Sequence, residues 1–287
     1  MEFRKAERRK AKLRLGITGP AGSGKTYGAL LVALGLGGKI ALIDTENGSG
    51  DFYSGLGEYD IGTLNAPYTV QKYLDAIKSC ETACYDVVII DSLSHAWAGA
   101  GGLLDVQGNL VDNSRMNSFS AWRKVTPLHN KLVETMLASK CHIIATMRSK
   151  TEYIQVENER GKAEIRKVGL APVQRDGMEY EFGVVFDLGV NHMVTVSKDR
   201  TSMFDGQAFT LSQETGHVLK EWLDSGVDYE AIRQRKEKLY HEYLSRNGGD
   251  QEATMKAMLA ITEGRYSRDW TDEDMVKLEA EIEKVGG

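Results

Sequence analysis

Residues 16–26 read GITGPAGSGKT, and this stretch decides the fold. Positions 19–26 match GxxxxGK[ST], the pattern of a glycine-rich loop that joins a strand to a helix. The flanking residues agree, because 13–17 alternate like a strand and TYGALLVALGL (26–36) has the apolar spacing of a helix. Two glycines follow and end that helix. The sequence therefore predicts a phosphate-binding loop between a strand and a helix.

The chemistry of this loop indicates a nucleoside triphosphate. Glycines let backbone N–H groups turn toward an anion, and the amino end of the following helix adds partial positive charge. In this pattern Lys25 reaches the β- and γ-phosphates, and the Thr26 hydroxyl ligates Mg²⁺. We therefore expect ATP and Mg²⁺ as cofactors. The residues expected to contact the nucleotide are Gly19, Pro20, Ala21, Gly22, Ser23, Gly24, Lys25, Thr26 and Tyr27.

Further apolar runs predict an α/β domain around the loop. KIALID (39–44) and YDVVIID (85–91) are continuous apolar runs that end in aspartate, as buried parallel strands do. A helical pattern at 68–80 lies between them, whereas the polar stretch 107–122 is typical of a mobile loop. More strands are expected at 141–147, 182–188 and 192–198. The predicted fold class is α/β, a P-loop NTPase core with a mostly parallel central sheet and its ligand at the carboxyl ends of the strands.

Two carboxylates are placed to act on a bound triphosphate. Asp91 ends the VVIID run, in the Walker B position, where a carboxylate holds Mg²⁺ through a water. Ser92 follows it, so a general base must come from elsewhere. Glu46 lies just past the strand at 39–44, where a carboxylate can orient the attacking water. The simpler alternatives are a helix N-cap for Asp91 and a surface position for Glu46.

Several segments resemble a known family. They are GPAGSGKT (19–26), IDTE (43–46), VVIIDSLSHAW (87–97), ATMRSK (145–150), KVGLAPVQRDGMEYEF (167–182) and TVSKDR (195–200). Together they resemble the RecA-type branch of P-loop ATPases, and more narrowly the phage-encoded RecA-core ATPases of the Sak single-strand annealing group. The resemblance covers residues 10–210. It implies a RecA-like core, a ring or filament, and action on single-stranded DNA.

The resemblance also implies roles for individual residues. Glu46 matches the glutamate after the second strand that acts as the catalytic base in RecA-like ATPases. Thr146 or Arg148 stands where a polar residue senses the γ-phosphate, in place of the glutamine of RecA. Lys198 and Arg200 match a Lys-x-Arg that reaches into the neighbouring subunit's site, where an added cation contributes about 10³ to 10⁵ in rate. An exposed charged turn is the simpler alternative for these last two residues.

Residues 148–181 form an insertion with a candidate DNA-binding surface. YIQVEN (153–158) and AEIRKVGL (163–170) are expected to pair as the strands of a protruding hairpin. Basic residues with interleaved tyrosines suit a single strand, because cations meet phosphates and rings stack on bases. The candidate DNA contacts are Arg148, Lys150, Arg160, Lys162, Arg166, Lys167 and Arg175. Glutamates dilute this charge, and a kinase lid or an oligomer contact are alternatives for the same segment.

The pattern along the chain predicts three parts. Residues 1–14 are a basic amino-terminal arm, 15–220 are the ATPase core, and 221–287 are a helical appendage. In the appendage helices are expected at 228–246 and 251–262, and a third is expected after Thr271 as its N-cap.

Composition limits the classes of function. The 287 residues include 41% hydrophobic and 27% charged residues, which is enough for a large core. A net charge of −5 excludes a generally basic nucleic-acid-binding molecule. Three scattered cysteines form no disulfide framework, and neither a secretory signal nor an apolar run of about 20 residues is present. We therefore expect a cytoplasmic protein without membrane contact, in the host cytoplasm if it is phage-encoded.

These patterns predict an ATPase, and the resemblance implies that it acts in phage recombination or strand annealing and is stimulated by single-stranded DNA. A single-strand-binding or recombination protein is an expected partner. Two alternatives remain open: a nucleotide-switched module that recruits replication or recombination partners, and a small-molecule kinase with 148–181 as its lid.

Overall fold

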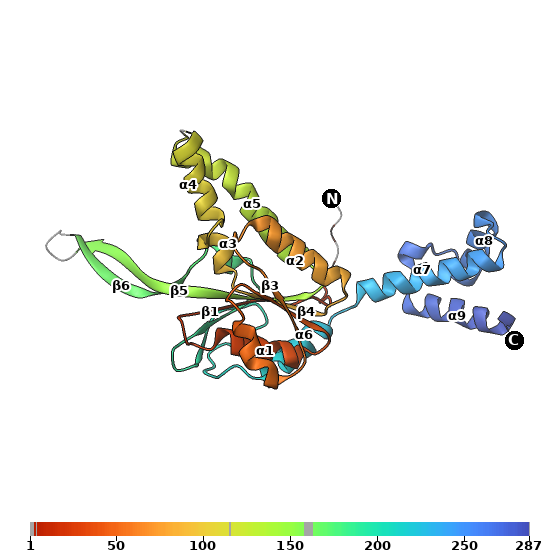
Figure 1. Cartoon of the computed structure of the whole chain (residues 1–287). Helices are drawn as coiled ribbons and strands as arrows, with labels where there is room; N and C mark the ends of the chain where they lie inside the picture. Colours follow the sequence, from red (N-terminus) through yellow and green to blue (C-terminus); the bar gives the residue numbers. More distant parts are fainter. Residues whose placement is uncertain (1–2, 4, 115, 158–162, 287) are drawn as a thin grey trace. The chain divides into compact units, whose positions relative to one another are not determined.

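The computed structural model describes residues 3, 5–114, 116–157 and 163–286 (Figure 1). The chain divides into two compact units. The larger unit is Ala11–Leu223, and the smaller one combines the residues up to Lys10 with those from Asp224 onward. Each unit has a hydrophobic core of its own.

A single sheet forms the centre of the larger unit. Among the described residues its strand order is β3-β2-β4-β5-β1-β7-β8, and β6 pairs with β5 outside this path. The strands are β1 Arg14–Gly19, β2 Ile40–Asp44, β3 Asp60–Thr63, β4 Val87–Asp91, β5 His142–Glu157, β6 Ala163–Pro172, β7 Val184–Leu188 and β8 Val194–Asp199. Neighbours from β3 to β7 are parallel, whereas the pairs β7–β8 and β5–β6 are antiparallel. The predicted α/β fold with a mostly parallel sheet is confirmed.

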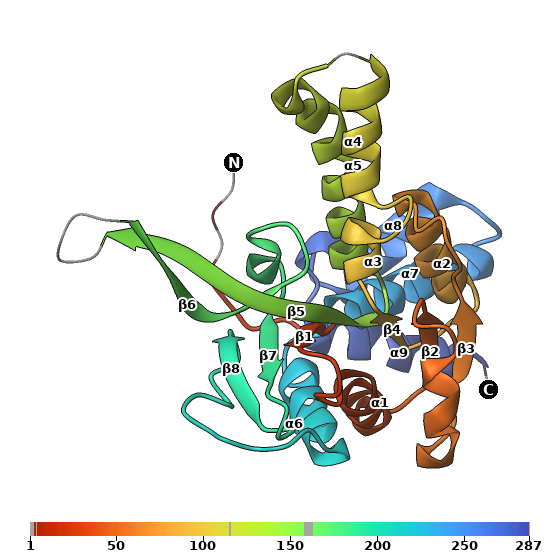
Figure 2. The ribbon, with the colours of Figure 1, turned by 60° about the vertical axis from the view of Figure 1, so that its left-hand side comes forward.

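Helices cover both faces of this sheet. On β4, Val88 and Ile90 pack toward α2 (Val70–Thr82) and α5 (Ser118–Ala138), whereas Val87 and Ile89 pack toward α1 (Lys25–Leu36) and α6 (Gln213–Asp224). Successive side chains of a strand point to opposite faces, so a strand buried on both faces is apolar throughout. Figure 2 shows the two helical layers on either side of the strands.

Helices α1 and α6 touch backbone to backbone. A Cβ on Gly35 of α1 would lie 1.9 Å from the Gln213 carbonyl oxygen, and one on Gly216 of α6 would lie 2.2 Å from that of Val32. Only glycine permits this approach. The carboxyl-terminal half of α1 is therefore fixed against its neighbour.

The predicted mobile loop at 107–122 is wrong. Helix α3 (Ser94–Ala98) is followed by α4 (Leu103–Ser114), and α5 begins at Ser118. The Asn117 side chain accepts a hydrogen bond from the backbone N–H of Ser120 at 2.8 Å, which makes this polar run the N-cap of a helix. Helices α4 and α5 project from the sheet side by side (Figures 1 and 2), so many of their residues face solvent and are polar.

The predicted hairpin is confirmed in its backbone. Strand β5 continues beyond the central sheet, and its residues from Ser149 to Glu157 pair with β6 from Pro172 back to Ala163. Figure 1 shows this β5–β6 extension as a ribbon that projects from the larger unit. Arg160 and Lys162 lie outside the described residues.

The smaller unit contains α7 (Tyr229–Arg246), α8 (Gln251–Ile261) and α9 (Asp272–Gly286). The predicted cap of α9 is present, since Thr271 Oγ1 accepts a hydrogen bond from the Asp274 N–H and Asp274 accepts one from the Thr271 N–H. The core of this unit contains Leu239, Tyr243, Met258, Trp270, Met275 and Leu278. A short 3₁₀ segment, η3 (Ser267–Asp269), lies between α8 and α9, and the larger unit contains the 3₁₀ segments η1 (Ser49–Leu56) and η2 (Met178–Tyr180).

Three basic residues of the amino-terminal arm have contacts within their own units. In the smaller unit, the Arg9 guanidinium lies 4.2 Å from the centre of the Tyr229 ring, and Lys10 Nζ lies 3.2 Å from Asp228. Arg14 begins β1 of the larger unit, and its guanidinium donates to the carbonyl groups of Cys141 at 2.7 Å and Leu137 at 2.9 Å. These charges therefore have partners within the chain.

No helix in the described part of the chain has both the length and the apolar character needed to cross a membrane.

Candidate functional site

The glycine-rich loop lies at the carboxyl end of β1. Gly19 is the last residue of that strand, and Gly24 is the N-cap of α1. Gly22 and Gly24 have φ angles of 77° and 88°, in the left-handed region that favours glycine. A Cβ on Gly19 would lie 2.4 Å from Ser23 Oγ, so glycine is required there as well. Glycine thus has a conformational or steric basis at three positions of the loop.

The loop presents hydrogen-bond donors suited to an anion. Among the described residues, no side chain caps the amino end of α1, so its first N–H groups remain available. Ser23 Oγ is buried without a hydrogen-bond partner among them. Lys25 Nζ donates to the Pro20 carbonyl at 2.8 Å, and burial lowers the pKa of Lys25, although Asp91 and Glu46 oppose this. An orphaned hydroxyl, free N–H groups and a half-buried ammonium fit a polyphosphate.

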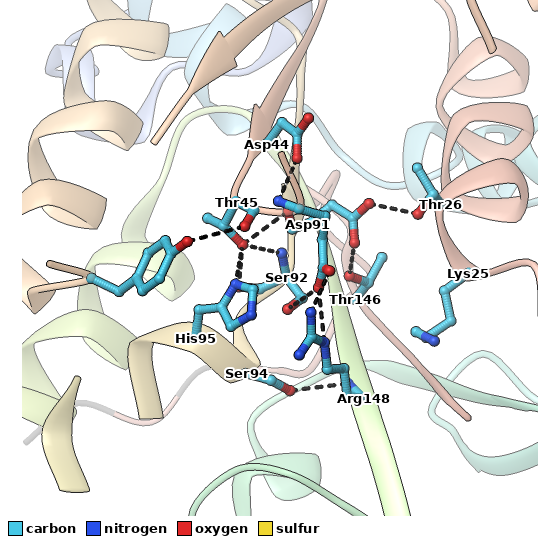
Figure 3. A network of polar contacts seen from close by, with 12 residues as sticks. Lys25, Thr26, Asp44, Thr45, Asp91, Ser92, Ser94, His95, Thr146 and Arg148 are labelled. Atoms are coloured by element: carbon cyan, nitrogen blue, oxygen red, sulfur yellow. Dashed lines mark hydrogen bonds and ion pairs between the residues drawn. The ribbon is translucent and has the colours of Figure 1, made fainter. Parts of the chain in front are cut away.

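Asp91 lies beside the loop, at the carboxyl end of β4. Its Oδ2 accepts a hydrogen bond from Thr26 Oγ1 at 2.6 Å, and its Oδ1 accepts one from Thr146 Oγ1 at 2.5 Å (Figure 3). Burial raises the pKa of Asp91, and these two hydroxyls partly offset the effect. The Thr26 hydroxyl and the Asp91 carboxylate are the hard oxygen ligands that Mg²⁺ takes, so the residues fit this ion.

Glu46 lies close to Asp91 because their strands are neighbours. Asp44 of β2 pairs in register with Asp91 of β4, and Glu46 follows two residues later. The Asp44 carboxylate accepts the backbone N–H of Glu46 at 2.6 Å, which fixes the chain as it leaves the strand. Glu46 Oε1 accepts hydrogen bonds from Ser92 Oγ at 3.0 Å and Arg148 Nε at 2.9 Å. Arg148 also pairs with Oε2.

The charge state of Glu46 follows from these contacts. Burial alone raises the pKa of its carboxyl group, but the hydrogen bonds and the charge of Arg148 outweigh burial and hold the pKa below its ordinary value. Glu46 is therefore ionised throughout the neutral range.

Thr45, a residue that sequence reasoning missed, joins the chain that leaves β2 to the chain that leaves β4. Its hydroxyl donates to the Asp91 carbonyl at 3.1 Å, accepts the Ser92 N–H at 2.8 Å, and lies 2.7 Å from His95 Nδ1. The His95 ring stacks on Tyr68 at 4.7 Å. Burial, and then the charge of Arg148, lower the pKa of His95, which favours the neutral ring. Figure 3 shows Thr45 between Asp91 and His95.

A cavity of about 560 Å³ adjoins the loop. The Tyr27 and Tyr53 rings meet edge to face at 5.6 Å, and His192 Nδ1 lies 3.1 Å from the Ser23 carbonyl oxygen. This volume is within the usual range for small-ligand sites, about 300–1,000 Å³. Of the lining residues, the sequence indicated Tyr27 but not Tyr53 of η1, His192 or Leu211, which come from segments distant in the chain.

Lys198 and Arg200 do not reach the loop of their own chain. Lys198 on β8 pairs with Val185 of β7, which pairs with Gly16 of β1, three residues before Gly19. The Arg200 N–H donates to the Gly183 carbonyl at 3.0 Å, and the Gly183 N–H donates to the carbonyl of Arg14 at the start of β1, the end opposite to the loop. Lys198 Nζ donates to the Tyr180 carbonyl at 2.6 Å, and Arg200 is exposed.

Most of the candidate DNA contacts lie on or just after the β5–β6 extension, whereas one lies beside Glu46. Lys150 is exposed on β5, Arg166 and Lys167 belong to β6, and Arg175 follows β6. Arg148 differs from them, because its guanidinium points to Glu46 rather than outward along the extension.

A strand, a glycine-rich loop with Lys25 and Thr26, and an aspartate on a parallel strand define a P-loop nucleotide-binding protein. The family model of the AAA domain matches residues 11–242, and the chain belongs to this family of P-loop AAA-type ATPases. No curated protein matches the chain by sequence.

Proposed function

We propose that this protein is a RecA-like ATPase that hydrolyses ATP with Mg²⁺ and acts on single-stranded DNA in recombination or strand annealing. The observation that carries the proposal is the position of Glu46, two residues past β2 and hydrogen-bonded to Ser92 and Arg148. This is the place that the RecA-type resemblance gives to the catalytic base, and it lies at the root of the β5–β6 extension.

Nucleotide binding is the first part of the proposal. The loop N–H groups and Lys25 would hold the phosphates, and Thr26 and Asp91 would hold Mg²⁺, which offsets negative charge on the phosphate oxygens. The cavity beside Tyr27 and Tyr53 is large enough for a base and a sugar. Aromatic rings provide faces and edges on which a base packs.

Hydrolysis is the second part. Glu46 is ionised and lies near Asp91, so it is suited to orient a water molecule and to take its proton as that water attacks the terminal phosphate. Thr146, hydrogen-bonded to Asp91, holds the metal-binding carboxylate in place.

Action on DNA is the third part. The projecting antiparallel extension carries Lys150, Arg166 and Lys167, and such cations bind the phosphates of a single strand. Lys198 Nζ contacts the Tyr180 carbonyl and the exposed Arg200 lies level with the start of β1, so both point away from their own loop, which suits residues that complete the site of a neighbouring subunit in a ring or filament.

The test is phosphate release from ATP with and without a single-stranded oligonucleotide. We expect turnover that needs Mg²⁺, rises with the oligonucleotide and disappears in Lys25→Ala. Oligonucleotide binding should weaken steeply with salt, because each neutralised phosphate releases counterions. Phosphate transfer only to an added small acceptor would identify a kinase instead. Slow turnover without any response to nucleic acid would favour the nucleotide-switched module.

A further inference from the structure

The turn between β7 and β8 lies against the phosphate-binding loop. Its residue His192 has Nδ1 at 3.1 Å from the Ser23 carbonyl oxygen. A Cβ on Gly24 would lie 3.2 Å from the same nitrogen, so the imidazole also packs against the backbone of the loop. His192 is one of the residues that line the cavity of about 560 Å³ beside the loop. The turn thus contributes a polar ring to the cavity in which a base and a sugar fit.

The backbone of the turn holds this ring in a defined position. His192 has a φ angle of 63°, in the left-handed region that residues other than glycine and asparagine rarely adopt. Its N–H donates to the Gly189 carbonyl at 2.9 Å, and the Gly189 N–H donates to the Met193 carbonyl at 3.0 Å. A left-handed conformation of such a residue persists where the surrounding contacts enforce it, often beside a ligand.

The contact with the loop decides which ring nitrogen carries a proton. A carbonyl oxygen only accepts, so Nδ1 of His192 must donate to Ser23. A neutral imidazole has a single N–H, and a proton on Nδ1 therefore leaves a lone pair on Nε2. Among the described residues Nε2 has no hydrogen-bond partner. In the neutral ring, Nε2 is therefore a hydrogen-bond acceptor that cannot turn into a donor without breaking the contact with the loop.

The other polar side chains of the cavity lack this fixed polarity. Among the described residues that line it, they are all hydroxyl groups, those of Ser23, Tyr27, Tyr53 and Thr210. A hydroxyl group rotates to donate or to accept, so it does not distinguish an amino group from a carbonyl oxygen. A fixed acceptor does, because it attracts an N–H and repels a lone pair.

We propose that His192 is the specificity-determining residue of the nucleotide site, with Nε2 accepting a hydrogen bond from the 6-amino group of adenine. This inference rests on the proposed function, which places the base of ATP in this cavity. Adenine has N–H donors at the 6-position, whereas guanine and hypoxanthine have a carbonyl oxygen there. That oxygen would face the Nε2 lone pair, and both would lose water without gaining a partner. The site therefore rejects 6-oxo purines.

The test compares the affinities of ADP and inosine diphosphate by calorimetry with Mg²⁺ at about pH 8, where a neutral imidazole is favoured. Neither binding measurement needs turnover or DNA. We expect wild type to bind ADP about tenfold more tightly or better, because an unpaired acceptor is costly to bury. Purine riboside diphosphate has neither group at the 6-position and should bind with intermediate affinity.

Two substitutions of His192 should remove the preference. Asparagine adopts the left-handed backbone, and its amide both donates and accepts, so the two affinities should become nearly equal in His192→Asn. His192→Gly keeps the backbone, lacks any side-chain polar group, and should give the same result. His217→Asn, which removes an exposed histidine of α6, is the matched control and should keep the wild-type ratio.

Equal affinities of wild type for ADP and inosine diphosphate would overturn the inference and leave the proposed function standing. The wild-type ratio in both His192→Asn and His192→Gly would overturn it as well. A preference for ADP that depends on His192, in a protein that does not hydrolyse ATP, would contradict the proposed function and support the inference. Binding of neither nucleotide would overturn both.

A second measurement observes the ring itself. ¹⁵N NMR of the histidine side chains, with the His192 signals assigned from their loss in His192→Asn, distinguishes a nitrogen that carries a proton from one that does not. In the ADP complex at the same pH we expect the proton on Nδ1 and a lone pair on Nε2. A proton on Nε2 in this complex would overturn the proposal whatever the affinities are.

Discussion

At the scale of single residues, the carboxyl groups of Asp91 and Glu46 lie at the ends of neighbouring strands, but their pKa values are shifted in opposite directions. Burial raises the pKa of Asp91, whereas Arg148 keeps that of Glu46 below its ordinary value despite burial. An acidic group whose pKa is raised has an ionised form that a bound cation stabilises strongly, which suits a metal ligand. One that is already ionised suits a base. The division of roles follows from surroundings rather than from residue type.

Replacement of Glu46 by Gln separates binding from chemistry. The amide cannot take a proton, so turnover should fall by about 10² to 10⁴. ATP affinity should be unchanged, since the phosphate-binding groups remain. Single-turnover phosphate release and calorimetry measure the two quantities. Near-normal turnover would place the base elsewhere.

Gly19→Ala tests the steric basis of the loop. The added Cβ would meet Ser23 Oγ at 2.4 Å and the Leu188 carbonyl oxygen at 2.8 Å, so the loop must shift. We expect ATP affinity to fall about tenfold or more, because loop donors lose their common direction. Gly62→Ala, whose Cβ would meet nothing within 4 Å, is the control. Equal affinities in the two variants would show that the loop tolerates a side chain.

At the scale of elements, Arg14 connects β1 to the end of α5. Its guanidinium donates to the backbone carbonyl of Leu137 in the last turn of α5 and to that of Cys141 just before β5, and burial lowers the pKa of Arg14 to about 10. The carboxyl end of a helix has unpaired carbonyls, and a cation there satisfies them. The Arg14 charge thus stabilises the fold of the larger unit.

Arg14→Met should destabilise the larger unit by about 2–3 kcal/mol, because backbone carbonyl groups at and after the end of α5 lose charged hydrogen-bond partners. Denaturant unfolding followed by hydrogen exchange at the end of α5 measures the loss. Arg123→Met on the exposed side of α5 is the control and should have little effect. Equal stabilities of Arg14→Met and wild type would show that Arg14 is only one of the surface charges of the amino-terminal arm.

Sequence patterns predicted the elements whose signal is local. The loop at 19–26, the apolar strands and the hairpin each depend on neighbouring residues. Helix α4 was missed because it projects into solvent and lacks a wide apolar face. Thr45 and Tyr53 were missed for a different reason: their contacts depend on which strands adjoin and how loops cross, and no short pattern encodes that.

At the scale of the whole molecule, the distance of Arg200 from its own loop predicts complementation between subunits. Arg200→Ala should lower turnover and leave ATP affinity near normal. Mixing it with Glu46→Gln should restore part of the activity, since one subunit then supplies Glu46 and its neighbour Arg200. Turnover of the mixture is compared with that of each variant alone. No recovery in a mixture shown to co-assemble would place Arg200 outside the site.

The glycine contact between α1 and α6 has a consequence for motion. It holds the far half of the helix that begins at the phosphate-binding loop, so α1 cannot slide along its axis unless α6 moves with it. We therefore expect any rearrangement that accompanies nucleotide exchange to occur in the segments that follow β2 and β4 rather than in α1.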